Sequence, residues 1–278
     1  MSAPVKTASR PAESRAVRVR ASEAEDRWLP WVLVAVLLSR LPLLGGGFGS
    51  SAEAWRNAVA ALHMRELGRY LPFRMPSFPV FEGFTALLIP GGSFATNAAA
   101  AVASLVAVLA FVRVARRAGI ARPFWPTVAF AFGAPLWVSS TMTIDFAFGL
   151  AFVLFAYSTA LDRRGAWTGL LLALAAGCRP ILWLLFPPML VVLLARGAKP
   201  GTVGRFAVTF VAISVVLAIL VLANAPPGQF GGSLGYRFQH LVTPQVIVPV
   251  LRRAAVFSLG KLGILVAALG LKIGRAHV

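Results

Sequence analysis

The sequence is dominated by apolar runs that approach the length needed to cross a lipid bilayer. A helix needs about 20 mainly apolar residues to span the hydrocarbon core, and a water-soluble fold cannot hide many helices that are apolar on all sides. The composition agrees, since 58% of the residues are hydrophobic, 13% are charged and the mean hydropathy is +0.79. We therefore expect an all-α polytopic bundle with about eight spans, near 28–44, 95–112, 124–139, 144–161, 167–178, 180–195, 206–223 and 254–271.

Short clusters of cations separate the apolar runs and give a formal net charge of +18. A nucleic-acid-binding protein would gather its cations on one soluble face, whereas membrane proteins keep Lys and Arg in cytoplasmic loops. With the N-terminus inside, the basic connectors 113–122, 162–165 and 196–205 fall on one side. The turn at 177–180 is then either a tight helical hairpin or a break in one element. We exclude nucleic acid as a partner and predict a multi-pass protein of the cell membrane with a cytoplasmic N-terminus.

The two ends of the chain differ from the membrane domain predicted at 28–271. Residues 1–27 are polar and rich in Arg, which predicts a disordered cytoplasmic tail. The first apolar run is then a retained anchor, as we expect, or a cleaved signal peptide. Residues 272–278 resemble the translation of a sequencing-library adapter, with an ordinary basic tail as the alternative. We expect them to be non-native, the natural protein to continue beyond residue 271, and this fragment to insert into membranes but be inactive.

The predicted outer loop at 45–94 is unusually long. The serine pair at 50–51 can cap a helix that begins near Ala52. The apolar face of that helix holds Trp55, Val59 and Leu62. The opposite face holds Glu53, Arg56, Asn57 and His63. This pattern predicts a helix that lies in the membrane interface, and a second short apolar helix at about 80–90 closes the loop.

Charged residues near the outer membrane face are the candidates for chemistry, because charges at membrane depth are costly unless they are paired or hydrated. The acids are Glu53, Glu66, Glu82 and Asp145. The cations include Arg40, Arg56, Arg65, Arg69, Arg74 and Arg179. Arg binds phosphate through a planar fork, so an anionic ligand would explain cations on this side. The alternatives are contact with lipid headgroups for Arg65 and Arg69, and an Arg partner or a helix-capping role for Asp145.

Several short motifs resemble one enzyme family. They are Ser39-Arg40-Leu41-Pro42, Glu53-Ala54-Trp55-Arg56, Gly68-Arg69-Tyr70, Arg74-Met75-Pro76-Ser77-Phe78-Pro79, Thr143-Ile144-Asp145-Phe146 and Gly177-Cys178-Arg179-Pro180. Over about residues 28–200 the chain resembles GT-C type membrane glycosyltransferases, and more narrowly bacterial proteins related to protein O-mannosyltransferases and aminoarabinose transferases. In that family an acid of the first outer loop is catalytic and lies near the phosphate of a polyprenyl-phosphate sugar. The matching residue is Glu53, followed by Ala54 where the family has a second acid.

The resemblance implies a membrane glycosyltransferase that moves a sugar from a polyprenyl-phosphate donor to an acceptor at the outer face of the cytoplasmic membrane. Glu53 would be catalytic, as a base or as the ligand of a divalent cation. Substrate binding would involve Arg40, Arg56, Arg74, Arg179, Asp145 and Glu82. The expected partners are the lipid-linked sugar and membrane lipids. The alternative is a non-catalytic polytopic protein, such as a carrier or transporter of lipid-linked sugars.

Overall fold

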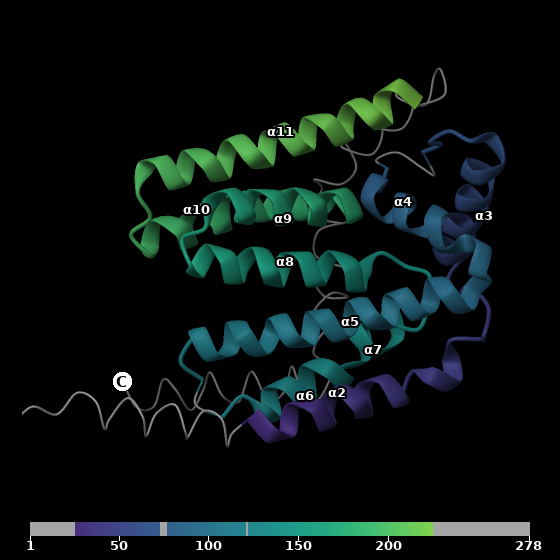
Figure 1. Ribbon diagram of the computed structural model, residues 1–278, viewed down its shortest axis with the longest axis horizontal. Coiled ribbons are helices and arrows are strands. Elements are labelled where there is room, and N and C mark those ends of the chain that lie inside the picture. The colour runs from purple at the N-terminus through teal and green to yellow at the C-terminus, as the bar shows by residue number, and fades with distance from the viewer. Residues whose placement is uncertain (1–25, 73–76, 121, 225–278) are drawn as a thin grey trace, which may run out of the picture.

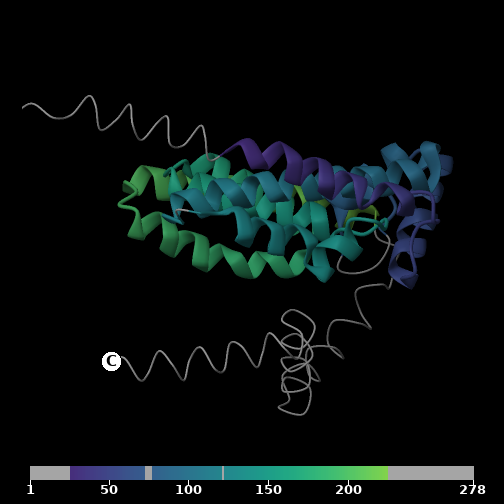
Figure 2. The same cartoon turned by 90° about the horizontal axis from the view of Figure 1, so that it is seen from below.

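The computed structural model describes residues 26–72, 77–120 and 122–224, and every regular element within these ranges is helical. This confirms the all-α class. The helices that run along the bundle are α2 (Leu29–Leu38), α5 (Gly92–Arg117), α6 (Phe124–Phe132), α7 (Ala134–Ser139), α8 (Phe146–Leu161), α9 (Gly165–Cys178), α10 (Phe186–Ala195) and α11 (Pro200–Asn224). Two further helices, α3 (Ala52–Leu67) and α4 (Pro79–Leu88), lie at one end of the bundle (Figures 1 and 2). The 3₁₀ turns are η1 (Asp26–Trp28), η2 (Leu41–Leu43), η3 (Ile89–Gly91) and η4 (Pro180–Leu185).

Some sequence predictions lie outside the described residues. They are the tail up to residue 25, Arg74, the span near 254–271 and the segment 272–278. Within the described residues, two helical stretches are long and apolar enough to cross a membrane, Pro79–Arg117 and Pro200–Asn224. The remaining apolar helices are shorter, so a count of about eight spans stays a prediction.

The run at 124–139 does not form one continuous helix. It divides into α6 and α7 at Gly133, whose ψ of 132° is extended. Pro135 has no amide hydrogen and its ring would collide with the carbonyl of Ala131, four residues earlier, so a continuous helix is unfavourable here. The break therefore follows from one proline, and the apolar pattern alone did not predict it.

The open question at 177–180 is resolved in favour of the hairpin. α9 ends at Cys178, and η4 and α10 fold back so that both contact α9 (Figure 1). The first helix is also part of the bundle, because Val32 and Val36 of α2 are buried in one cluster with Val108 of α5 and Ala131 of α6.

The connectors predicted to be cytoplasmic meet at one end of the bundle, which we call the basic end (residues 113–117, 162–165 and 196–205) (Figure 1). Arg117 Nη2 lies 2.9 Å from Asp162 Oδ2, which joins α5 to the α8–α9 connector. α9 packs closely on α11 there, because a Cβ added at Gly165 would lie 2.0 Å from the carbonyl oxygen of Thr202. The opposite end, which carries α3 and α4, we call the α3–α4 end.

The separation of the two ends predicts a definite topology. In a Cys178→Ala background, Ala118→Cys at the basic end should react with an impermeant thiol reagent from the cytoplasmic side only, because basic loops stay inside. Ala52→Cys at the α3–α4 end should react from the outer side only. Both alanines are exposed, so access through the protein does not limit either reaction. Labelling of both variants from the same side would contradict this topology.

Candidate functional site

The start of α8 and the end of α9 bring one carboxylate and one guanidinium together at the α3–α4 end. Arg179 Nη1 donates to Asp145 at 3.4 Å to Oδ1 and 3.2 Å to Oδ2. The Asp145 side chain is fully buried, whereas that of Arg179 is 25% exposed. The guanidinium carbon of Arg179 also lies 3.6 Å from the centre of the Phe146 ring, a cation–π geometry. The ion pair is therefore held on two sides.

Arg179 has hydrogen-bond donors beyond the one used in the ion pair. Its remaining guanidinium nitrogens make no hydrogen bond to a described residue. Donors in a rigid planar fork suit phosphate or carboxylate, so the pair can accept an anion without breaking. Of the two structural alternatives for Asp145, the Arg partner is observed, because the side chain pairs with Arg179. The side chain makes no capping hydrogen bond to α8.

A second polar cluster surrounds Glu82 of α4. Glu82 is 1% exposed and its Oε2 accepts hydrogen bonds from the hydroxyls of Tyr70 and Ser77. Burial of the Tyr70 phenol raises its pKa most, and the charge of Glu82 and the hydrogen bond to Glu82 raise this pKa further. The phenol therefore remains protonated and donates its hydrogen bond. These hydrogen bonds attach Tyr70, just after α3, and Ser77, just before α4, to the same carboxylate.

An apolar cluster links the two polar ones. Cys178, which precedes Arg179, is buried with Phe78 and Phe81 of the α4 segment. The Phe81 ring also contacts the Phe148 ring of α8, with centroids 5.5 Å apart. Glu82 and the Asp145–Arg179 pair therefore belong to neighbouring parts of the same end of the molecule.

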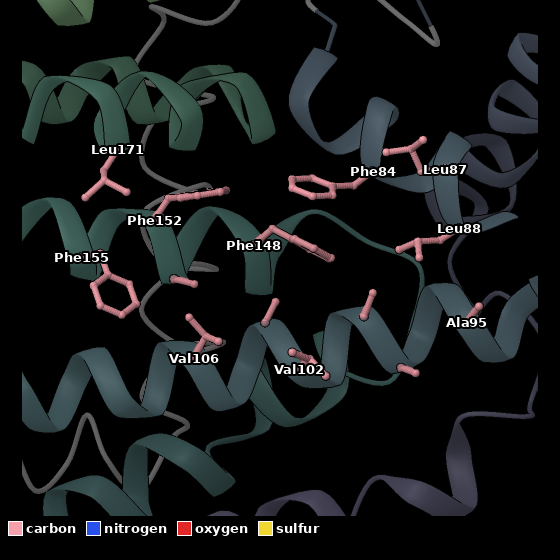
Figure 3. A pocket seen from close by; sticks show the side chains of 14 residues that line it. Phe84, Leu87, Leu88, Ala95, Val102, Val106, Phe148, Phe152, Phe155 and Leu171 are labelled. Carbon is pink, nitrogen blue, oxygen red and sulfur yellow. The ribbon is translucent and has the colours of Figure 1, made fainter. Parts of the chain in front are cut away.

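An apolar groove of about 800 Å³ lies between α4, α5 and α8 (Figure 3). All of its lining side chains are Phe, Leu, Val or Ala. Along α5 the lining extends from Ala95 to Val106, a rise of roughly 16 Å at 1.5 Å per residue. Phe148 lines the groove and follows Asp145 by three residues, so the groove reaches to within about one helical turn of the ion pair.

Glu53 and Arg56 lie on α3, which begins as the sequence predicts. Ser51 caps the helix by accepting hydrogen bonds from the amides of Glu53 and Ala54, at 3.1 and 3.4 Å. Glu53 is half-buried in the first turn. Arg56 is exposed and lines a hollow of about 330 Å³ together with Trp55 and His63. The predicted phosphate ligand Arg74 lies outside the described residues.

Arg40 occupies a different environment from the one predicted. It is fully buried, and its guanidinium donates to Ser140 Oγ at 2.7 Å, to the carbonyl oxygens of Val36 and Ala131 at 2.8 Å each, and to Ser39 Oγ at 3.0 Å. Four of the five donors of an Arg thus serve the protein itself. We therefore leave Arg40 out of the candidate phosphate site and assign it a structural role.

The buried face of α3 differs in one respect from the one that the sequence pattern predicts. The sequence pattern places Asn57 on the polar outer face, but it is 2% exposed, and among the described residues neither of its side-chain polar atoms has a hydrogen-bond partner. The predicted apolar face is indeed largely exposed, since the exposed fractions of Trp55, Val59 and Leu62 are 52%, 48% and 42%. The buried stripe of α3 contains mainly Ala and packs against α4, and Ala is too weakly apolar to have marked this face in the sequence.

No sequence pattern predicted the partners of Glu82, or the buried cluster formed by Thr96, Asn97 and Thr143. Within the described part of the chain, no three His, Cys, Asp or Glu side chains come together as a metal site, so a divalent cation stays an untested prediction. Comparison with protein-family models, curated proteins and solved structures finds no match. The site must therefore be interpreted from its own geometry.

The burial of Asp145 predicts a specific pattern of stability. Arg179→Met should destabilise the protein by about 3 kcal/mol, because it removes a guanidinium that pairs with a buried carboxylate. Adding Asp145→Asn should recover most of this loss, since the remaining groups are then neutral. Thermal unfolding of the detergent-solubilised protein checks the prediction. Equal destabilisation by the single and double variants would contradict it.

Proposed function

We propose that the protein is a membrane glycosyltransferase that moves a sugar from a polyprenyl-phosphate donor to an acceptor at the outer face of the cytoplasmic membrane. The observation that carries the proposal is the apolar groove that reaches to within about one helical turn of the Asp145–Arg179 pair. A lipid phosphate has the same two parts, a hydrocarbon chain and an anionic head. Its chain would lie in the groove, and its phosphate would meet the free donors of Arg179.

The charge distribution supports the same arrangement. Of the acids at described positions with described side chains, Glu53, Glu66, Glu82 and Asp145 belong to the α3–α4 end, and only Asp162 lies at the basic end. Under the positive-inside rule the α3–α4 end faces outward. A reaction there would use a donor supplied within the membrane, with no need for a nucleotide-binding domain. The proposal includes about eight membrane spans and an α3 helix that lies in the membrane interface.

The chemistry is a substitution at the anomeric carbon of the donor. Glu53 would take the proton from an acceptor hydroxyl. The acceptor oxygen would form a bond to the anomeric carbon as the bond from that carbon to the phosphate oxygen breaks. The polyprenyl phosphate would leave with the electron pair of this bond, and Arg179 would stabilise its developing charge. Arg56, with Arg74 of the loop, is the further candidate for phosphate contact.

Substitutions at Arg179 and Glu53 should separate binding from chemistry. Arg179→Lys keeps the charge but loses the planar fork, so we expect donor affinity to fall about tenfold, as measured by titration of the detergent-solubilised chain with a polyprenyl-phosphate sugar. Glu53→Gln should leave donor affinity nearly unchanged and lower turnover of the full-length protein about a hundredfold or more. Arg69→Lys and Glu66→Gln, both at exposed positions of the α3 segment, are the matched controls.

Near wild-type turnover of Glu53→Gln would overturn the catalytic assignment. Donor binding without transfer to any acceptor, combined with movement of the lipid-linked sugar across proteoliposome membranes, would instead support the carrier alternative. Unchanged donor affinity of Arg179→Lys would remove Arg179 from the binding site.

The groove gives a separate prediction. Ala99→Phe adds a ring inside the groove and should weaken binding of a long-chain donor about tenfold, whereas a donor with only two isoprene units should be affected little because its chain does not extend along the groove. Leu109→Phe is the control, because Leu109 is exposed on the same helix and does not line the groove. Equal affinity of Ala99→Phe and wild type for the long-chain donor would contradict this placement.

A further inference from the structure

A buried hydrogen-bonded cluster lies where three segments of the α3–α4 end meet. Asn97 of α5 is fully buried, and its Nδ2 donates to the carbonyl oxygens of Leu44 at 3.0 Å and Gly47 at 2.8 Å. Its Oδ1 accepts from the hydroxyl of Thr143 at 3.0 Å. The hydroxyls of Thr96 and Thr143 are 2.6 Å apart. One amide side chain thus uses both its donors and its acceptor to join α5, the loop before α3, and the segment before α8.

Each of the two segments joined by Asn97 leads directly to a candidate site residue. Thr143 precedes Asp145 by two residues, and its backbone amide donates to the carbonyl oxygen of Phe48 at 2.9 Å. On the other side, the Trp55 indole donates to the carbonyl oxygen of Gly49 at 2.8 Å, and Trp55 follows Glu53 by two residues. The loop at 44–49 is therefore attached at one end to Asn97 and at the other to the helix of Glu53.

The loop and the segment before α8 also contact each other directly. Gly49 has a φ of +128°, and a Cβ added there would lie 2.7 Å from Met142 Cγ. The hydroxyl of the neighbouring Ser50 lies 3.7 Å from the sulfur of Met142. This contact gives a place to measure whether the two segments stay together.

We propose that Asn97 is a positioning residue that holds the loop before α3, which leads into the helix of Glu53, against the segment carrying Asp145, so that the two carboxylates belong to one site. The inference rests on the proposed function for its catalytic consequence, but the clamp itself is a statement about two chain segments. Removing the amide takes the donor away from the buried carbonyl of Leu44 and the partly buried carbonyl of Gly47, which is costly, and leaves the Thr143 hydroxyl with Thr96 alone of its two side-chain partners. The loop would then separate from the segment before α8 while α5 itself remains intact.

Disulfide formation between Ser50→Cys and Met142→Cys, in a Cys178→Ala background, measures the clamp without any need for activity. We expect Asn97→Leu and Thr143→Val to slow cross-linking about tenfold, because the first removes every hydrogen bond of the amide and the second removes its bond to the segment before α8, each with a side chain of similar shape. Thr143→Ser keeps the hydroxyl and should cross-link at the parent rate. Ser104→Ala is the control, since Ser104 is equally buried on α5 but bonds only to Ala101 of its own helix. If Asn97→Leu does not fold, the Thr143 pair carries the test.

Measuring kcat tests whether the clamp contributes to catalysis. In the full-length protein, Thr143→Val should lower kcat at least tenfold, with a smaller loss of donor affinity, because Arg179 is carried by the end of α9 and reaches the clamped segment only through its ion pair with Asp145; Thr143→Ser should restore kcat. Cross-linking that is unaffected by Asn97→Leu and Thr143→Val would overturn the clamp, and slowed cross-linking with unchanged kcat would overturn its positioning role. If cross-linking slows but the wild-type protein transfers no sugar, the clamp stands and the proposed function fails.

Discussion

The structure depends on the rule that a polar group inside an apolar bundle must find its partner within the protein. The clearest case is the carbonyl of Ala131, which loses its helical partner because Pro135 has no amide hydrogen. The buried guanidinium of Arg40 donates to this oxygen at 2.8 Å. The same side chain bonds to Ser140, so the end of α2 is attached to both sides of the break between α6 and α7. A helix-breaking residue at the break between α6 and α7 thus explains a buried cation at the end of α2.

The α3–α4 end follows the same rule and gains its shape from it. Asn97, Glu82 and Asp145 are each nearly or fully buried and each bonds to a segment distant in sequence. These contacts connect irregular stretches that apolar packing alone would leave in several arrangements. Polar residues are costly inside a bundle, and here they are concentrated where the loops need a fixed conformation. The candidate site therefore lies where the local structure is determined by directional bonds.

Much of this organisation could be predicted from the sequence, and the exceptions have physical causes. The Ser51 cap, the short helix near residue 80 and the grouping of basic connectors follow from local patterns, and all three are present. The burial of Asn57 could not be predicted, because which face of α3 is covered depends on α4 rather than on α3. The hydrogen bond from Tyr70 to Glu82 likewise requires two segments to meet, and no spacing rule signals it. Local chemistry specifies where helices begin, whereas tertiary contacts decide which charged groups are available to a ligand.

The groove arises from a contrast between two kinds of helix contact. α9 and α11 approach so closely that a Cβ added at Gly169 would lie 2.4 Å from the carbonyl oxygen of Phe206, as is common where small residues line helix interfaces in membranes. Around the groove, α5 instead contributes mainly Ala, while α8 contributes Phe148, Phe152 and Phe155. These three rings recur at helical spacing on one side of α8 and are too large to fit between closely packed backbones. The groove therefore exists because of the residues on that face of α8. It extends along α8 from Phe148, near the Asp145–Arg179 pair, to Phe155 in the apolar part of the bundle.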